Sequence, residues 1–200
     1  MQIEHLIVFN IALLFAIASP GPALLIAMQT TLSTSRKAGI AIGCGLGLMA
    51  SLWTMMALLG LNAVFDTVPW FYGVAKFIGA GYILYIAWHM WIGANEPIKA
   101  RFKLERHAFR QGFLVNLLNP KSVLFAAGVL IVIFPPHMTP AESAIVVLNH
   151  FFVELTFYTL LASVMNSNAV SKRYMKAKVY IDRTASLILC ALAIRLVLST

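Results

Sequence analysis

Two long stretches of this sequence carry no charged side chain. Residues 6–35 and residues 38–65 contain no Asp, Glu, Lys or Arg and are mostly apolar. A helix of about 20 residues crosses a hydrocarbon core about 30 Å thick, so each stretch is long enough to span a membrane. The rest of the chain has the same character, because 60% of all 200 residues are hydrophobic and only 11% are charged. We therefore interpret the chain as an all-α, polytopic membrane protein rather than a soluble domain.

Six apolar segments are long enough to form membrane-spanning helices. Their connections alternate in charge, because eleven of the fifteen Lys and Arg residues lie in the connections that follow the first, third and fifth segments. Basic loops stay in the cytoplasm, so both termini are expected on the opposite side of the membrane. The predicted spans are residues 6–30, 39–62, 68–92, 112–134, 141–164 and 180–198.

The net charge of +8 is explained by these basic connections. The longest of them, at residues 93–111, is expected to contact anionic lipid headgroups at the inner leaflet. We expect no nucleic-acid partner. The basic residues predicted to meet lipid are Lys99, Arg101, Lys103 and Arg106.

The first predicted span contains the sequence Ser19-Pro20-Gly21-Pro22 near its middle. Each proline removes a backbone donor and clashes with the preceding helical turn, and the glycine between them adds backbone freedom. Within a bilayer, backbone groups freed in this way must face protein or line a water-filled cavity. Broken membrane helices of this kind are typical of transporter binding sites.

Span four contains a second proline interruption, Asn116-Leu117-Leu118-Asn119-Pro120-Lys121. The two interruptions occupy matching positions, since each lies in the first span of a three-span half. An odd number of spans makes the halves insert in opposite orientations, which is the pattern of an inverted 3+3 repeat with a site between the repeats. We expect one membrane domain, with a first repeat at residues 1–92, a basic cytoplasmic linker at 93–111 and a second repeat at 112–200.

Two further motifs accompany the Ser-Pro-Gly-Pro sequence. They are KFIGAGYILY at residues 76–85 and NLLNPKSVLF at residues 116–125. In this order and with six spans, the three motifs resemble the LysE/RhtB family of bacterial amino-acid exporters over essentially the whole chain. The resemblance implies a secondary active exporter in the bacterial inner membrane, with both termini periplasmic.

Shorter matches are similar to the threonine and homoserine efflux members of that family. They lie at residues 34–37, 57–61, 153–155 and 180–182. One difference is Gly81-Tyr82, where many members have Ala-Tyr. The resemblance implies export of small neutral amino acids such as threonine or homoserine, coupled to proton antiport. A passive amino-acid or ion channel with the same six helices is the alternative function.

Nine residues at the two breaks and in span five are predicted to bind the substrate. The half-helices that begin after Pro22 and Pro120 present unpaired N–H groups and positive dipole ends, which suit a carboxylate. Glu154 lies near the middle of span five, where a charged side chain is costly and is a functional candidate for the ammonium group. The nine residues are Ser19, Pro20, Gly21, Pro22, Asn116, Asn119, Pro120, Lys121 and Glu154.

Several charged residues have two interpretations. Glu154 is a substrate and proton site, or a structural partner of Lys76 or Lys121. Lys121 is placed to meet a substrate carboxylate, to neutralise Glu154 or to reach the cytoplasmic surface. Asp182 is the second candidate for the coupling proton. Asp182 and Arg183 alternatively pair with neighbouring residues or form an inner gate.

The sequence has no pattern of an enzyme, a cofactor site or a metal site. His89 and His150 lie near the ends of their spans and are interpreted as interfacial residues. No pair of histidines or carboxylates has metal-ligand spacing. There is also no Walker loop and no nucleophile–base pair.

Two local patterns predict helix packing and a helix start. Gly39, Gly43 and Gly47 recur on one face of span two and allow another helix to approach closely. We expect that helix to belong to the same chain, although the face also permits a homodimer. The sequence Thr139-Pro140-Ala141-Glu142 is a capping box, which predicts the start of the fifth helix.

Overall fold

The computed structural model describes residues 1–200 except 20, 68–70, 96–106, 136–137, 166–167 and 199–200. The described part is built from eight α-helices and contains no strand. The helices are α1 (Ile3–Ala18), α2 (Pro22–Ser33), α3 (Arg36–Thr67), α4 (Phe71–Gly93), α5 (Ala108–Leu117), α6 (Pro120–Ile133), α7 (Pro140–Val164) and α8 (Asn168–Leu198).

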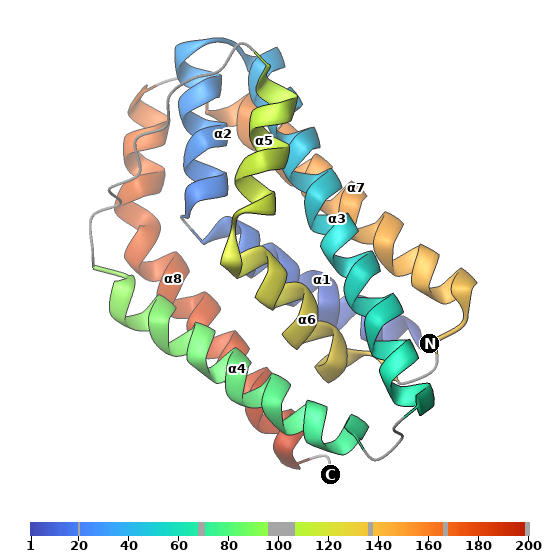
Figure 1. The fold of residues 1–200 in the computed structure, drawn as a ribbon. Coiled ribbons are helices and arrows are strands. Elements are labelled where there is room, and N and C mark those ends of the chain that lie inside the picture. Colours follow the sequence, from blue (N-terminus) through green and yellow to red (C-terminus); the bar gives the residue numbers. More distant parts are fainter. Residues whose placement is uncertain (20, 68–70, 96–106, 136–137, 166–167, 199–200) are drawn as a thin grey trace.

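The helices pack as a bundle in which sequence-distant elements lie side by side. Helix α3 packs mainly against α5 and α7, and α4 packs mainly against α8. Helices α1 and α6 lie in the middle of the molecule (Figure 1). The α2–α3 connection, the start of α5 and the end of α7 gather at one end, whereas the N-terminus, the end of α3 and the start of α7 lie toward the other. The basic pair Arg36 and Lys37 lies at the first of these ends.

Several helices are suited to a membrane by length and composition. Within the described residues, Arg36–Gly60 and Pro140–Val164 are each long and apolar enough to cross a bilayer. Two pairs of consecutive helices, each bent at a short break, meet the same criteria when each pair is counted as one span. The axes of α1 and α2 differ by 61°, and those of α5 and α6 differ by 68°. With these helices, the chain has the composition of a multi-pass membrane protein.

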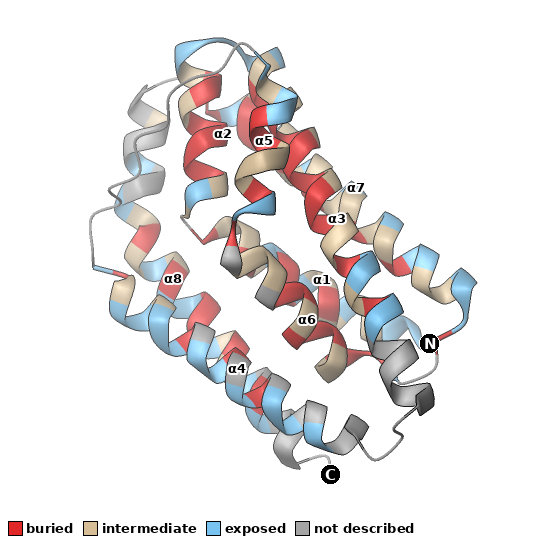
Figure 2. Cartoon of the chain, viewed as in Figure 1, coloured by how far each residue is buried: buried red, intermediate tan, exposed pale blue. Residues whose placement is uncertain are grey.

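Large apolar side chains cover much of the outer surface. Trp88 is 63% exposed on α4, and Leu160 is 60% exposed on α7. Exposed residues run along α4 and α8, while buried residues gather on α1, α2, α3 and α6 (Figure 2). An apolar exterior of this extent is unfavourable in water but matches a lipid environment.

The glycine face of α3 packs against α7 of the same chain. A Cβ atom placed on Gly39 would lie 3.2 Å from Ala162 Cβ, and one on Gly43 would lie 2.3 Å from Tyr158 Cβ. A Cβ on Gly47 would lie 3.2 Å from Glu154 Cβ. The predicted packing within one chain is therefore confirmed. These glycines also set how closely α7 approaches the centre of the bundle.

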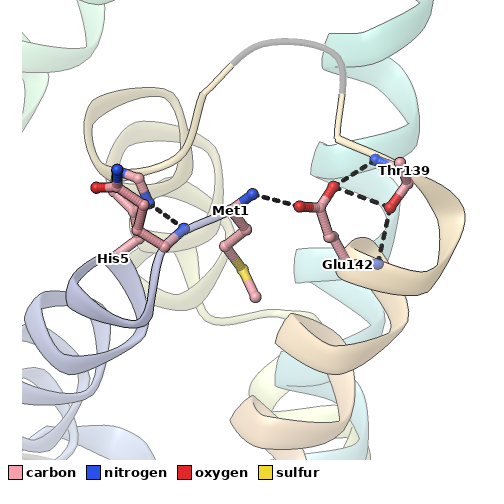
Figure 3. A network of polar contacts seen from close by, with 5 residues as sticks. Met1, His5, Thr139 and Glu142 are labelled. Atoms are coloured by element: carbon pink, nitrogen blue, oxygen red, sulfur yellow. Dashed lines mark hydrogen bonds and ion pairs between the residues drawn. The ribbon is translucent and has the colours of Figure 1, made fainter.

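The capping box at the start of α7 is confirmed (Figure 3). Thr139 Oγ1 accepts from the Glu142 backbone N–H at 3.3 Å, and the Thr139 N–H donates to Glu142 Oε2 at 2.9 Å. The Met1 amino group also contacts Glu142 Oε1. Asn10 and Asn149 exchange side-chain hydrogen bonds at 3.2 and 2.6 Å. These contacts join α1 to the first half of α7.

Candidate functional site

A pocket lies where the interruptions between α1 and α2 and between α5 and α6 meet. The empty space in it, including the open mouth, is about 500 Å³. Helices α3 and α7 also contribute to the wall. Seven of the predicted substrate-binding residues line it, namely Ser19, Gly21, Pro22, Asn116, Asn119, Lys121 and Glu154. Pro20 is outside the described residues, and Pro120 is the first residue of α6.

The two half-helices present different N-termini to this region. Helix α6 is capped by Asn119, whose side-chain oxygen accepts from the Lys121 backbone N–H at 3.1 Å. Helix α2 has Gly21 at its N-cap and, among the described residues, receives no side-chain hydrogen bond there. Because the first N–H groups of a helix have no partner within the helix, the start of α2 is the more available anion site.

Glu154 is a buried carboxylate with one unused oxygen. The residue is only 4% exposed, and its Oε1 lies 3.3 Å from His150 Nε2. Its Oε2 is buried and has no hydrogen-bond partner among the described residues. Leaving a buried acceptor unpaired is costly, so such an atom is a candidate ligand contact. The alternative structural partner Lys76 lies in a part of α4 whose side chain is not described.

Asn116 supplies a second unused acceptor in the same pocket. Its Nδ2 donates to the Leu46 carbonyl at 2.9 Å, which fixes the orientation of the amide. Its Oδ1 is buried and lacks a partner within the described part of the chain. The pocket therefore contains two acceptor oxygens, on Asn116 and Glu154, that can receive N–H or O–H donors.

The interpretation of His150 as an interfacial residue was wrong. Its side chain is buried, with 2% of the residue exposed, and its Nδ1 lies 2.7 Å from Thr54 Oγ1. His150 also lines the pocket beside Glu154. The sequence spacing could have indicated this position, because His150 and Glu154 are four residues apart and therefore lie on the same face of a helix. His89, in contrast, lies on an exposed position of α4 against the Tyr85 ring.

Lys121 points inward to the end of α1. Its Nζ donates to the Ala16 carbonyl at 2.8 Å. Carbonyls in the last turn of a helix lack helical partners and favour a nearby cation. Among the described pocket residues, Lys121 and Glu154 are the cation and the carboxylate, and their side chains bond to different partners, Ala16 and His150.

Asp182 joins α8 to the interruption between α1 and α2. Ser19 Oγ donates to its Oδ1 at 2.5 Å, and Lys178 Nζ donates to its Oδ2 at 2.9 Å. The predicted pairing of Asp182 with a neighbouring residue is confirmed. The predicted spans place Lys178 in the basic connection between the fifth and sixth spans. It is instead 8% exposed within α8 and also donates to the carbonyls of Gly93 and Ala94.

The described side chains do not form a metal-binding group of three or more His, Cys, Asp or Glu residues. Arg183 lies over the Trp91 ring at 5.2 Å. The polar side chains of the pocket and of the Asp182 contact thus provide acceptors, two carboxylates (Glu154 and Asp182) and two lysines (Lys121 and Lys178). Groups of both charges suit a small zwitterion.

The sequence matches the family model of the LysE type translocator over residues 14–200. It is 28% identical over 193 residues to the threonine efflux protein of Escherichia coli K12, covering 92% of this chain and 93% of that protein. Identity to the threonine efflux protein of Salmonella typhi is 24% over 200 residues, covering 96% and 97%. An uncharacterized membrane protein of Haemophilus influenzae is 29% identical over 189 residues, covering 88% and 87%. No solved structure gives a significant match.

Proposed function

Because this chain belongs to the LysE type translocator family, we propose that it exports small neutral amino acids by proton antiport across the bacterial inner membrane. The family match and the threonine efflux relatives support amino-acid export. Threonine and homoserine are the favoured substrates. Both termini are periplasmic in this proposal, because the basic connections Arg36–Lys37 and residues 93–111 belong in the cytoplasm.

The observation that carries the proposal is the unused Glu154 oxygen in the pocket between the two helix interruptions. A substrate ammonium supplies the donors that Glu154 Oε2 and Asn116 Oδ1 lack. The substrate carboxylate is received by the start of α2 and by Lys121. The substrate hydroxyl is left to the remaining polar groups of the pocket, including Ser19 and Asn119.

The charge balance of the pocket favours a substrate with no net charge. Glu154 and Lys121 match one ammonium and one carboxylate. The neighbouring Asp182 is already engaged by Ser19 and Lys178, so it offers no free partner to a second substrate cation. Burying an unpaired charge is expensive. Basic amino acids are therefore expected to be poor substrates.

Proton coupling in this proposal uses the carboxylate that binds the substrate. Glu154 Oε2 accepts either a substrate N–H or a proton, so loading of one opposes loading of the other. Asp182 is the second proton candidate, because its loss of charge would weaken its contacts with Ser19 and Lys178.

We also propose that residues 1–92 and 112–200 are inverted three-span repeats around this site. The placement of the two interruptions supports that arrangement.

The proposal is tested by loading proteoliposomes with a panel of amino acids, with and without an imposed pH gradient. Threonine and homoserine are expected to leave fastest, uphill export is expected only with the gradient, and lysine is expected to stay inside. Equilibration of solutes without accumulation would instead support a passive channel. A possible homodimer is checked by the mass of the purified protein.

A further inference from the structure

A buried polar chain links α3 to the proposed ammonium site. Thr54 of α3 contacts His150 of α7 at 2.7 Å, and His150 contacts Glu154 one turn later at 3.3 Å. Thr54 is fully buried, and His150 and Glu154 are only 2% and 4% exposed. Polar groups placed this deep in an apolar bundle are expensive and are retained where they act together.

Aromatic packing restricts the imidazole ring. The Phe9 ring meets it edge-on with centroids 5.5 Å apart, and the Phe125 ring lies 6.5 Å away. Two hydrogen bonds and two aromatic contacts therefore leave little freedom for the His150 side chain. A histidine that merely filled space would not need partners at both ring nitrogens.

The hydrogen-bonding roles follow from the chemistry of the carboxylate. An ionised Glu154 can only accept, so His150 Nε2 must carry the proton that lies between them. In a neutral ring, Nδ1 is then an acceptor and receives a hydrogen bond from the Thr54 hydroxyl. This arrangement occupies Glu154 Oε1 and leaves Oε2 without a partner among the described residues.

We propose that His150, held by Thr54, is a positioning residue that fixes the Glu154 carboxylate and directs its free oxygen to the substrate ammonium. The inference rests on the proposed amino-acid export. When Glu154 Oε2 takes a proton instead of a substrate N–H, Oε1 still accepts from His150 Nε2–H, so the ring keeps its tautomer and its hydrogen bond with Thr54. The two states of the site thus differ by what Oε2 holds, and His150 and Thr54 hold the carboxyl group in one orientation in both.

Other titratable groups near this chain are few in the described structure. Lys121 of α6 and Tyr158 of α7 line the same pocket, and Asp182 of α8 contacts Ser19 at its edge. The hydrogen bonds of the His150 ring join it to Thr54 and Glu154. The orientation of the Glu154 carboxylate is therefore expected to depend on His150 more than on the other groups.

The test uses the full-length protein in proteoliposomes loaded with threonine. His150→Leu removes the donor, and the internal threonine concentration for half-maximal export is expected to rise roughly tenfold. The maximal export rate is expected to change much less than the half-saturation concentration, because the variant acts on binding. His150→Gln retains a side-chain N–H and is expected to restore most of the affinity. Thr54→Val is expected to raise the half-saturation concentration by a smaller factor.

His89→Leu is the matched control, because it makes the same change at an exposed histidine of α4 and is expected to leave export unchanged. His150→Leu with a wild-type half-saturation concentration would overturn the positioning role. A lower maximal rate with unchanged half-saturation would do the same, since it indicates a structural role alone. If His150→Leu does not fold, His150→Gln and Thr54→Val decide the question. Absence of export by the wild-type protein would instead refute the proposed function.

Discussion

Replacing Gly43 with alanine tests how closely α3 and α7 must approach to build the pocket. The added Cβ would lie 2.3 Å from Tyr158 Cβ and 3.0 Å from Tyr158 Cγ, whereas carbon atoms in contact prefer about 3.5–4.0 Å. The helices must therefore separate by about 1 Å at this point. Overpacking of this kind costs about 1–3 kcal/mol, and alanine returns about 1 kcal/mol of helix propensity.

We expect Gly43→Ala to lower the free energy of unfolding by about 1 kcal/mol. For a chain of this size, that corresponds to a fall in melting temperature of about 2–4 °C. Threonine affinity is also expected to fall, because Tyr158 lies one turn from Glu154 and the shift moves both residues. Thermal unfolding in detergent and threonine export are the measurements.

Two other glycines provide graded controls for this substitution. A Cβ on Gly81 of α4 would meet no described atom within 4 Å, so Gly81→Ala is expected to be neutral or slightly stabilising. Gly47 is intermediate, with a contact at 3.2 Å to Glu154 Cβ. Equal stability of the Gly43 and Gly81 variants, with equal export, would refute the close α3–α7 contact.

Two charged contacts give further predictions. Lys121→Met removes the donor to the Ala16 carbonyl and is expected to lower the free energy of unfolding by about 1.5–3 kcal/mol. It is also expected to weaken threonine binding. Unfolding and equilibrium binding are the measurements, and wild-type values in both would contradict the role of Lys121. Asp182→Asn leaves Lys178 buried without its carboxylate and is expected to cost about 3–5 kcal/mol. Adding Lys178→Met should recover part of that loss, and a double-mutant cycle with no coupling would show that the ion pair contributes nothing. If Asp182 carries the coupling proton, Asp182→Asn also stops uphill export while downhill exchange continues.

Features set by local chemistry could be predicted from the sequence. Thr139 and Glu142 form their capping box because the partners are three residues apart. Gly39, Gly43 and Gly47 all face α7 because their spacing keeps them on one side of α3, and Gly39 also faces Thr31 of α2. The sequence also pointed to Ser19, Asn116, Lys121 and Glu154, which the structure brings into one pocket.

Features that depend on tertiary packing were harder to predict. The position of His150 along its span predicts an interfacial residue, whereas its burial depends on the helix face that it turns to Thr54 and Phe9. Hydropathy predicts Lys178 to be a loop cation, because it does not reveal Asp182 and the carbonyls of Gly93 and Ala94 as its partners. The first half of α8 therefore contributes a buried charge that cannot be predicted from hydropathy.

The central claim is that Glu154 Oε2 receives the substrate ammonium, and Glu154→Gln tests it most directly. The amide keeps the size of the side chain but replaces the charged acceptor, and losing a charge-assisted hydrogen bond lowers affinity by roughly tenfold or more. We predict that the variant is folded, as judged by its elution and melting profile, and that it largely loses threonine export from proteoliposomes under a pH gradient. Unchanged, pH-driven export by Glu154→Gln would contradict the account.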